Sequence, residues 1–220
     1  IKIVAAAFTG VELFWYVKAD SPYKKFTDLA GKKVGYSRPG SSTNMVLLRM
    51  SELSGIKVEA VPTGGIPENY TAVMTGQIAA GWSVPPQRIE EIRKGTLRII
   101  AQGADFPELQ GMTIRVHIAN TDFLKQKPAV ARALFRAYQR SLDFNYDKTS
   151  AILPEFARLN KTTPEIAEEA LKFFPKKGLA LSPVTGMEYQ NENAVDFGFL
   201  KKKMPQQQRN EWIDRRYLPK

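Results

Sequence analysis

Short apolar runs and loops of small residues alternate along the first half of the chain. The runs are bounded by Gly, Pro and Ser, and several are followed by residues with the spacing of a helix. Strands joined to helices by short loops are typical of an α/β domain, in which helices cover a parallel sheet. The strands expected from this pattern are 1–8, 13–18, 33–37, 56–61, 77–84 and 97–101, and helices are expected to begin near residues 42, 67 and 86.

The pattern changes near residue 120, where strands give way to helices. The last expected strand, 112–118, alternates so that its even-numbered residues are apolar, and Thr113, Arg115 and His117 lie on the other face. Beyond residue 127 the apolar spacing is mostly helical, which marks a break in the organisation of the chain. The helices expected there are 128–146, 148–159, 164–174, roughly 186–200, and 205–213.

The stretch 28–44 carries the clearest ligand-binding pattern. Gly40, Ser41, Ser42 and Thr43 lie where a strand ends and a helix begins. Gly40 allows a tight turn, and Ser42 or Thr43 is a natural N-cap. A helix N-terminus has unpaired N–H groups and a partial positive charge, so it attracts anionic or polar ligand groups. The alternative is a plain capped turn, because any strand-to-helix loop favours these residue types.

Three loops follow expected strands at their carboxyl ends, where ligands bind in parallel sheets. The first is 38–43. The second is 63–66, whose Gly64 and Gly65 let a ligand approach the backbone or form an ordinary turn. The third, 82–86, begins with Trp82, which is either an aromatic wall of a binding site or a core side chain.

Composition and charge narrow the class of protein. Of the 220 residues, 43% are apolar and 25% are charged, which is typical of a globular protein. No apolar run reaches the ~18 residues of a membrane-spanning helix. The net charge of +10 is spread along the chain, and no nucleic-acid-binding motif accompanies it. We therefore expect a general surface charge that either aids solubility or steers anionic solutes, and no nucleic-acid partner.

Catalytic and metal chemistry find no support in the sequence. The chain has no cysteine, which excludes disulfides, thiolate chemistry and Cys-based metal sites, and which suits an oxidising compartment. His117 is the only histidine, and a lone histidine on a strand is usually structural. We find no nucleophile–base pair, phosphate-binding loop or metal-ligand cluster, so we expect no enzyme activity, no catalytic residue, no metal site and no cofactor.

The order of the motifs resembles that of the nitrate/taurine/sulfonate-type substrate-binding proteins of ABC importers. These proteins have a type II periplasmic-binding fold, with two α/β lobes, two crossover segments and a ligand cleft between the lobes. The resemblance covers nearly the whole chain. The matching pieces are DLAGKKVGYSRPGSSTN (28–44), VPTGGIPENYTAVMTGQIAAGWSVPP (61–86), GTLRIIAQGADFPELQGMTIRV (95–116), TDFLKQKPAVARALFRAYQRSLDFNY (121–146) and PQQQRNEWI (205–213).

The resemblance implies a division of the chain. Residues 1–33 would be the remaining part of lobe 1 and the first crossover, 34–110 the α/β lobe 2, and 111–220 the return crossover and the helical C-terminal part of lobe 1. The sequence begins with Ile1, without Met, inside a strand pattern. We therefore expect that the N-terminal part of lobe 1, and a signal peptide before it, are missing from this sequence.

The resemblance also assigns candidate ligand-binding residues. Thr9 falls where the first crossover begins, and Arg115 lies on the polar face of the return strand, where it could neutralise an anion. A solvated strand-face arginine is the alternative for Arg115, and Arg38 is a candidate of the same kind. The complete set is Thr9, Gly40, Ser41, Ser42, Thr43, Gly64, Gly65, Trp82 and Arg115.

The function implied is that of a monomeric periplasmic solute-binding protein. It would capture a small anionic or polar organic solute between its lobes and deliver it to the transmembrane subunits of an ABC permease. One alternative is the ligand-sensing effector domain of a regulator, which would carry a DNA-binding motif ahead of Ile1. A second is an enzyme of the thiamine-pyrimidine-synthase type on the same fold. The absence of cysteine and the single histidine disfavour the enzyme.

Overall fold

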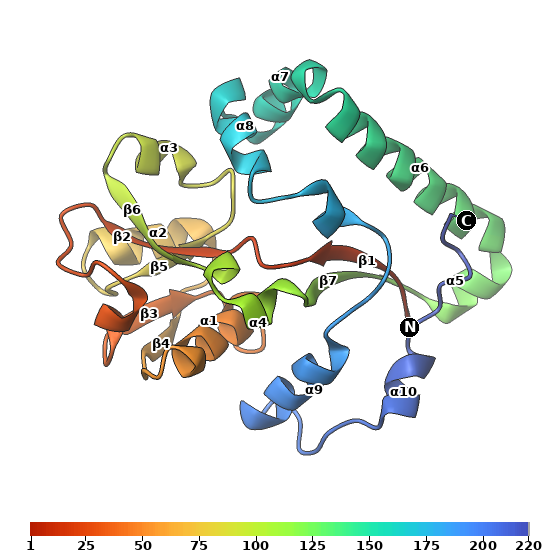
Figure 1. Cartoon of the computed structure of the whole chain (residues 1–220), viewed down its shortest axis with the longest axis horizontal. Coiled ribbons are helices and arrows are strands. Elements are labelled where there is room, and N and C mark those ends of the chain that lie inside the picture. Colours follow the sequence, from red (N-terminus) through yellow and green to blue (C-terminus); the bar gives the residue numbers. More distant parts are fainter. Residues whose placement is uncertain (220) are drawn as a thin grey trace. The chain divides into compact units, whose positions relative to one another are not determined.

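The computed structural model describes residues 1–219 as two compact units of mixed α/β structure (Figure 1). Unit 1 contains residues 1–10, 111–164 and the chain from 174 onward, and unit 2 contains 11–110 and 165–173. The α/β fold class expected from the sequence is confirmed. The three-part division into 1–33, 34–110 and 111–220 stays a prediction.

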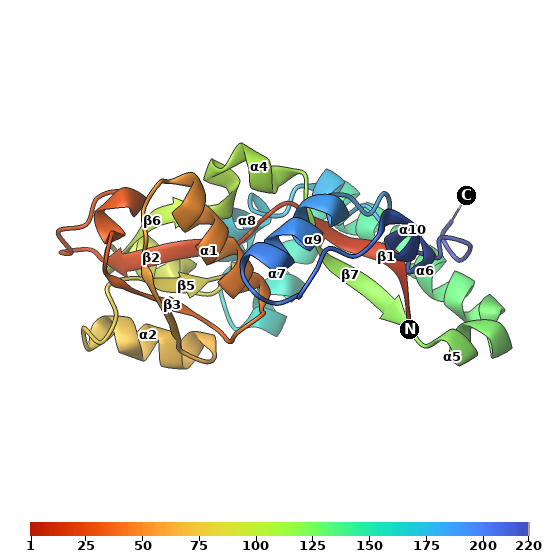
Figure 2. The same ribbon diagram turned by 90° about the horizontal axis from the view of Figure 1, so that it is seen from below.

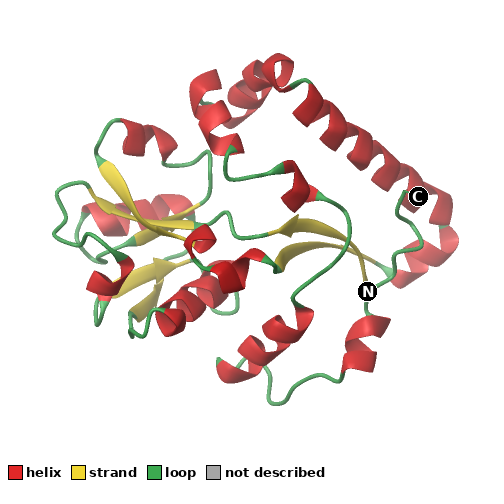
Figure 3. Ribbon diagram, viewed as in Figure 1, coloured by secondary structure: helices red, strands yellow, loops and turns green. Residues whose placement is uncertain are grey.

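Unit 2 contains a three-stranded sheet, in the order β5–β2–β6, and a two-stranded sheet of β3 and β4, and one bridge next to β5 connects the two in the order β4–β3–β5–β2–β6. β3 and β4 pair in parallel, and the bridge from Val34 to Ala80 continues the parallel direction to β5. The amide of Gly35 supports this bridge by donating to the oxygen of Ala80 over 2.9 Å. The five strands are β2 (Phe14–Lys18), β3 (Lys33–Tyr36), β4 (Glu59–Pro62), β5 (Gly81–Ser83) and β6 (Leu97–Gln102), drawn in yellow in Figure 3.

One strand runs against the expected parallel direction. β2 is antiparallel to both β5 and β6, with Phe14 opposite Ser83 and Tyr16 opposite Gly81. Both partners of β2 come far later in the chain and are not joined to it by a single crossover helix, so no strand–helix–strand connection constrains them to run parallel to β2. Phe14 to Val17 are all buried, as is expected of a strand covered on both faces.

Helices cover both faces of this sheet. α2 lies on one face and α1 on the other (Figure 2). The α2 face holds an apolar cluster in which Phe14 and Tyr16 of β2 pack with Val73 of α2 and with Ile166 and Phe173, which belong to the later segment 165–173 of this unit. The helical elements of unit 2 are η1 (Phe26–Leu29), α1 (Ser42–Leu53), α2 (Ile66–Met74), α3 (Ile89–Arg93), η2 (Gly103–Asp105), α4 (Pro107–Gln110) and most of α8 (Pro164–Leu171).

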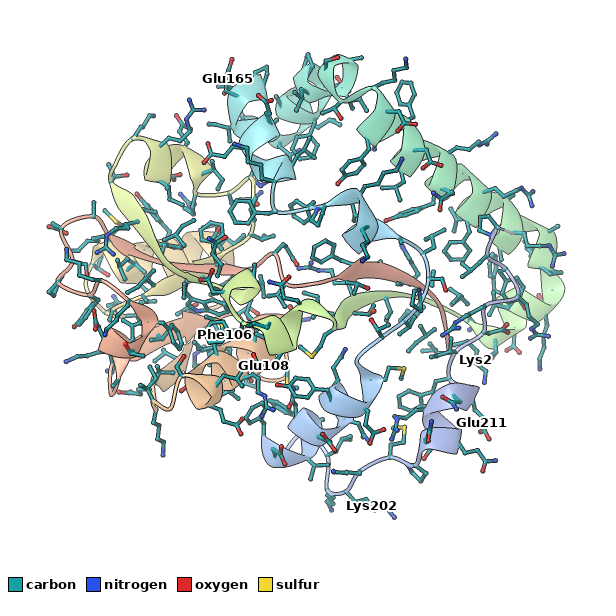
Figure 4. The ribbon with its side chains drawn as sticks, viewed as in Figure 1. Lys2, Phe106, Glu108, Glu165, Lys202 and Glu211 are labelled. Carbon is teal, nitrogen blue, oxygen red and sulfur yellow. The ribbon has the colours of Figure 1, made fainter. Side chains whose placement is uncertain are left out.

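Unit 1 is built on a two-stranded antiparallel ribbon. β1 (Lys2–Thr9) pairs with β7 (Thr113–Ala119), and the amide of Asp214 donates to the oxygen of Ile3 on the other edge of β1. Lys2 also donates from its ammonium to the main-chain oxygen of Glu211, and both residues are labelled in Figure 4. The helical elements of unit 1 are α5 (Thr121–Gln126), α6 (Pro128–Asp147), α7 (Thr149–Asn160), η3 (Lys176–Leu179), α9 (Met187–Asp196) and α10 (Gln206–Glu211).

The simple alternation expected for β7 is wrong. Thr113 is buried, whereas Ile118 is 61% exposed. His117 packs edge-on against Phe135 and Tyr138 of α6, with ring centroids 5.7 and 5.1 Å away. The pairing with β1 shifts register three times, which disrupts the regular inward and outward alternation. Thr113 and His117, which were expected on a polar face of β7, therefore pack inside unit 1.

No helix among residues 1–219 is both long enough and apolar enough to cross a membrane.

Candidate ligand-binding site

The three loops singled out in the sequence lie at one edge of the unit 2 sheet. β3, β4 and β5 run in the same direction, so their carboxyl ends, at Tyr36, Pro62 and Ser83, meet at the same edge. A hydrogen bond joins the second loop directly to the segment that leads into the first. The amide of Gly64 donates to the oxygen of Ser37 over 3.0 Å.

The loop before α1 is closed by its own side chains. Ser41 is the N-cap, because its Oγ accepts from the amide of Asn44 over 3.2 Å. The expectation of Ser42 or Thr43 as the cap is therefore wrong by one or two residues. Asn44 in turn accepts from the amide of Gly40 over 3.0 Å, and Gly40 has the positive φ of +74° that a tight turn requires.

Thr43 holds this loop in shape. Its Oγ1 accepts from the amide of Ser37 over 2.9 Å and is bonded to the hydroxyls of Ser37 and Ser41 over 2.8 and 2.9 Å. The residue is 3% exposed. Its side chain is thus fully engaged inside the loop, which gives Thr43 a positioning role.

The first backbone N–H groups of α1 are available to bind a ligand. The N–H groups of Ser42 and Thr43 have no acceptor within residues 1–219, as is general for the first turn of a helix. Gly40 is exposed, and Ser41 and Ser42 are half-buried. α1 has 12 residues, so its N-terminus carries the partial positive charge of a full helix.

Asn69 ties the second and third loops to the strands beside them, and it was not predicted from the sequence. It is fully buried, and its Nδ2 donates to the hydroxyl of Tyr16 over 3.0 Å and to the oxygen of Trp82 over 2.9 Å. Its Oδ1 accepts from the hydroxyl of Thr63 over 3.1 Å. Burial raises the pKa of the Tyr16 hydroxyl above its ordinary value, so this partner stays neutral. The sequence signal that could have found Asn69 is its spacing of four residues from Val73, which places both side chains on the same face of the helix.

Trp82 lies within the sheet, directly opposite Trp15 of β2. It is 8% exposed, and its Nε1 is buried without a hydrogen-bond partner among residues 1–219. The Nε1 of Trp15, by contrast, donates to the oxygen of Gly35 over 3.0 Å. The burial favours the core interpretation of Trp82, and contact with a ligand stays a prediction.

The loop after β5 brings in an arginine that the sequence did not point to. Arg88 has a φ of +70° and caps α3, and its guanidinium lies 4.2 Å from the ring centroid of Tyr70. It is also paired with Glu91. These contacts fix the loop against α2 and leave the guanidinium engaged with the protein.

The remaining candidates belong to unit 1 or to exposed loop positions. Thr9 bonds through its hydroxyl to that of Thr113 over 2.8 Å, and Arg115 lies opposite Phe8 in the β1–β7 pairing. Gly64 and Gly65 are exposed at the α2 loop. The ligand-binding role of all nine candidates stays a prediction.

Metal binding finds no site in the described part of the chain. Within residues 1–219, no group of three or more His, Asp and Glu side chains is arranged to hold a metal ion.

Solved structures show what class of fold this is. The chain superposes on the periplasmic aliphatic sulphonate-binding protein SsuA of Escherichia coli with a TM-score of 0.72 and 20% identity, covering 92% of this chain and 68% of that one. The alkanesulfonate-binding SsuA of Xanthomonas axonopodis pv. citri, bound to MOPS, gives a TM-score of 0.76 at 15% identity, over 97% and 74% of the two chains. The fold is that of periplasmic binding proteins.

An enzyme shares this fold. The desulfurization enzyme DszB matches with a TM-score of 0.70 and 14% identity, over 98% of this chain and 77% of that one. The fold alone therefore does not separate binding proteins from enzymes.

The sequence itself then gives the family. The model of the family described as NMT1/THI5 like matches residues 1–151, and the chain belongs to that family. No curated protein sequence matches the chain.

Proposed function

We propose that this chain is the solute-binding component of an ABC importer, and that it binds a small organic anion at the carboxyl edge of β3, β4 and β5. The periplasm is the corresponding compartment, and the transmembrane subunits of a permease are the corresponding partner. The family, the fold and the absence of cysteine all support this proposal.

The observation that carries the proposal is the N-terminus of α1. Two adjacent amides, of Ser42 and Thr43, have no acceptor among the described residues 1–219, and they belong to a loop fixed by side-chain hydrogen bonds. An oxyanion accepts hydrogen bonds from such amides and is stabilised by the helix dipole. The net charge of +10 adds a long-range attraction for anions.

A sulfonate is the first candidate for the anionic group. Its three oxygens can accept from two amides and a serine hydroxyl at once, which matches the donors at Ser41 to Thr43. The printed names of two structural relatives, which bind aliphatic sulphonates and alkanesulfonates, support the same choice.

Binding is favoured over catalysis by the state of the loop hydroxyls. The hydroxyls of Ser37 and Ser41 are each bonded to that of Thr43, and within residues 1–219 no histidine, lysine or carboxylate is hydrogen-bonded to any of the three. A hydroxyl without an adjacent base is a weak nucleophile at neutral pH.

The test is a proline substitution that removes one amide and little else. Ser42 is the first residue of α1, where proline is well tolerated, and Ser41 before it has the extended conformation (φ −75°, ψ 164°) that proline requires. Ethanesulfonate, nitrate and cytosine serve as probes in calorimetric titrations. We expect Ser42→Pro to weaken ethanesulfonate binding about 10- to 100-fold, because a hydrogen bond to a charged group contributes about 1.5–3 kcal/mol.

The matched control is Thr121→Pro, at the first residue of α5. Asn120 caps that helix and has the same extended conformation (φ −67°, ψ 134°), so the change is equivalent but lies in unit 1. It should leave the affinity unchanged. Binding of cytosine without binding of either anion, or unaltered affinity in Ser42→Pro, would contradict the proposal.

A further inference from the structure

A cavity of about 450 Å³ lies at the opposite, amino-terminal edge of the unit 2 sheet. It is formed where β3 begins, at Lys33, at Ala79 just before β5, and where the antiparallel β2 ends, at Lys18. None of the candidate residues of the carboxyl edge lines it. Its volume is within the range of about 300–1,000 Å³ that is usual for small-molecule sites.

The wall contributed by the turn after β2 is firmly held. Arg98 of β6 donates from Nη2 to the oxygen of Tyr23 over 2.7 Å and to that of Ser21 over 3.3 Å. The amide of Tyr23 donates to the hydroxyl of Ser21, which is 8% exposed. On the other side, the amide of Ala79 donates to the oxygen of Lys33 over 2.8 Å. The cavity is therefore part of the fold.

The charges that line this cavity are mainly positive. Lys18, Lys32 and Lys33 line it together with a single carboxylate, that of Asp20. None of the three lysines forms an ion pair with any of residues 1–219. Three ammonium groups around one concave site repel one another and favour an anion between them.

A neighbouring cavity makes the contrast clear. It measures about 630 Å³ and shares Lys33 with the first, but its other charged lining residues are Glu59 and Glu68. Excess positive charge is thus a property of the first cavity and not of the whole surface around Lys33.

The uncharged part of the lining suits an apolar body. Val73 and Ile78 contribute aliphatic surface, and the ring of Tyr23 lies 6.0 Å from the ammonium of Lys32. A ligand that places a flat ring against Tyr23 and Ile78 would bring its anionic group to the lysines.

We propose that this cavity is a second binding site of unit 2, which takes a small organic anion with a flat apolar body. The site is independent of the α1 N-terminus, so it does not depend on the function proposed above.

Phenyl phosphate is a suitable probe, because it combines a ring with a doubly charged group. Inorganic phosphate tests the charge alone, and phenol tests the ring alone. We expect calorimetry at low ionic strength to rank the affinities as phenyl phosphate, then inorganic phosphate, then phenol. In ¹H–¹⁵N spectra of the full chain, phenyl phosphate should shift the amides of residues 32–33 and 77–79.

The variant Lys18→Gln/Lys32→Gln/Lys33→Gln should weaken phenyl phosphate binding about tenfold or more, because it removes all three charge-assisted contacts. The control Lys25→Gln/Lys57→Gln/Lys172→Gln removes the same charge from exposed positions of unit 2 outside the cavity, and it should bind as the wild type does. An equal loss in both triple variants would show a general charge effect and overturn the proposal.

The Ser42→Pro variant separates the two sites. Phenyl phosphate binding that survives this change supports a second site. Binding that is lost with it, or spectral shifts confined to residues 37–43, would place the probe at the α1 loop and overturn the second site without affecting the function proposed above.

Discussion

The side-chain nitrogen of Asn69 donates a hydrogen bond of 2.9 Å to the main-chain oxygen of Trp82, from inside the packed face of α2. The same side chain is bonded to Tyr16 and Thr63. One buried amide thus joins a helix, two strands and a loop of the candidate site. The geometry of the carboxyl edge therefore depends on Asn69, although this residue need not touch the ligand.

Removal of the Asn69 side-chain amide should destabilise the fold. We expect Asn69→Ala to lower the free energy of unfolding by about 2–4 kcal/mol, because it removes three buried hydrogen bonds, to Tyr16, Thr63 and Trp82, and opens a small void. Urea denaturation followed by tryptophan fluorescence measures this. Thr71→Ala, an exposed substitution on the same helix, should cost less than about 1 kcal/mol. Similar losses in the two variants would show that Asn69 does not hold the edge together.

Gly81 should tolerate no side chain. A Cβ there would lie 2.6 Å from Nδ2 of Asn69 and 2.7 Å from Cγ2 of Val73. We expect Gly81→Ala to destabilise unit 2 by about 1–3 kcal/mol through overpacking. Gly111→Ala is the control, since nothing lies within 4 Å of its Cβ position. Thermal unfolding of the two variants compares them, and equal melting temperatures would contradict the close packing of α2 on β5.

Thr43 should act on ligand affinity through the shape of its loop. In Thr43→Val the amide of Ser37 loses its acceptor, and the Ser41 hydroxyl loses a partner. We expect weaker ethanesulfonate binding together with a loss of about 1–3 kcal/mol of stability. Thr43→Ser keeps the hydroxyl and should restore most of both. If Thr43→Ser behaves like Thr43→Val, the methyl packing rather than the hydroxyl network holds the loop.

His117 should give unit 1 a dependence on mildly acidic pH. Burial lowers the pKa of its imidazole below the ordinary value of 6.5. Below pH 6.5 the unfolded chain therefore binds the proton more readily than the folded chain, and stability falls as the pH falls. The stabilisation is fully present above pH 6.5.

The variant His117→Phe isolates this effect, because the new ring can pack against Phe135 and Tyr138. Between pH 7 and pH 5 the wild type should lose more unfolding free energy than the variant, by about 1.4 kcal/mol for each unit by which the pKa is lowered. Urea denaturation at both pH values measures the difference. Parallel losses would assign the pH dependence to other groups.

The order of strands and helices could be predicted because apolar runs and glycine breaks are local signals. The direction of β2 could not, because Phe14 finds its partners in residues 83 and 102, far along the chain. The cap at Ser41 was ambiguous, since three consecutive hydroxyl residues can each accept from an amide two or three positions ahead.

Within the candidate site, the loops were visible in the sequence and the residue that joins them was not. Asn69 is an ordinary polar residue in a helical pattern, and only the packing of α2 against β5 gives it three partners. The lysine-lined cavity was equally hidden, because Lys18, Lys32 and Ile78 come from separate segments that only the sheet brings together.

The return of residues 165–173 to unit 2 has a consequence for the order of synthesis. Phe173 lies 5.8 Å from Phe14 between ring centroids, and Ile166 belongs to the same apolar cluster. A nascent chain can pair all five strands of unit 2 once residue 102 has emerged, but its core is incomplete until Phe173 follows. Through that interval the apolar face of β2 lacks part of its cover, and exposed apolar surface of this kind makes a partly folded chain prone to aggregation.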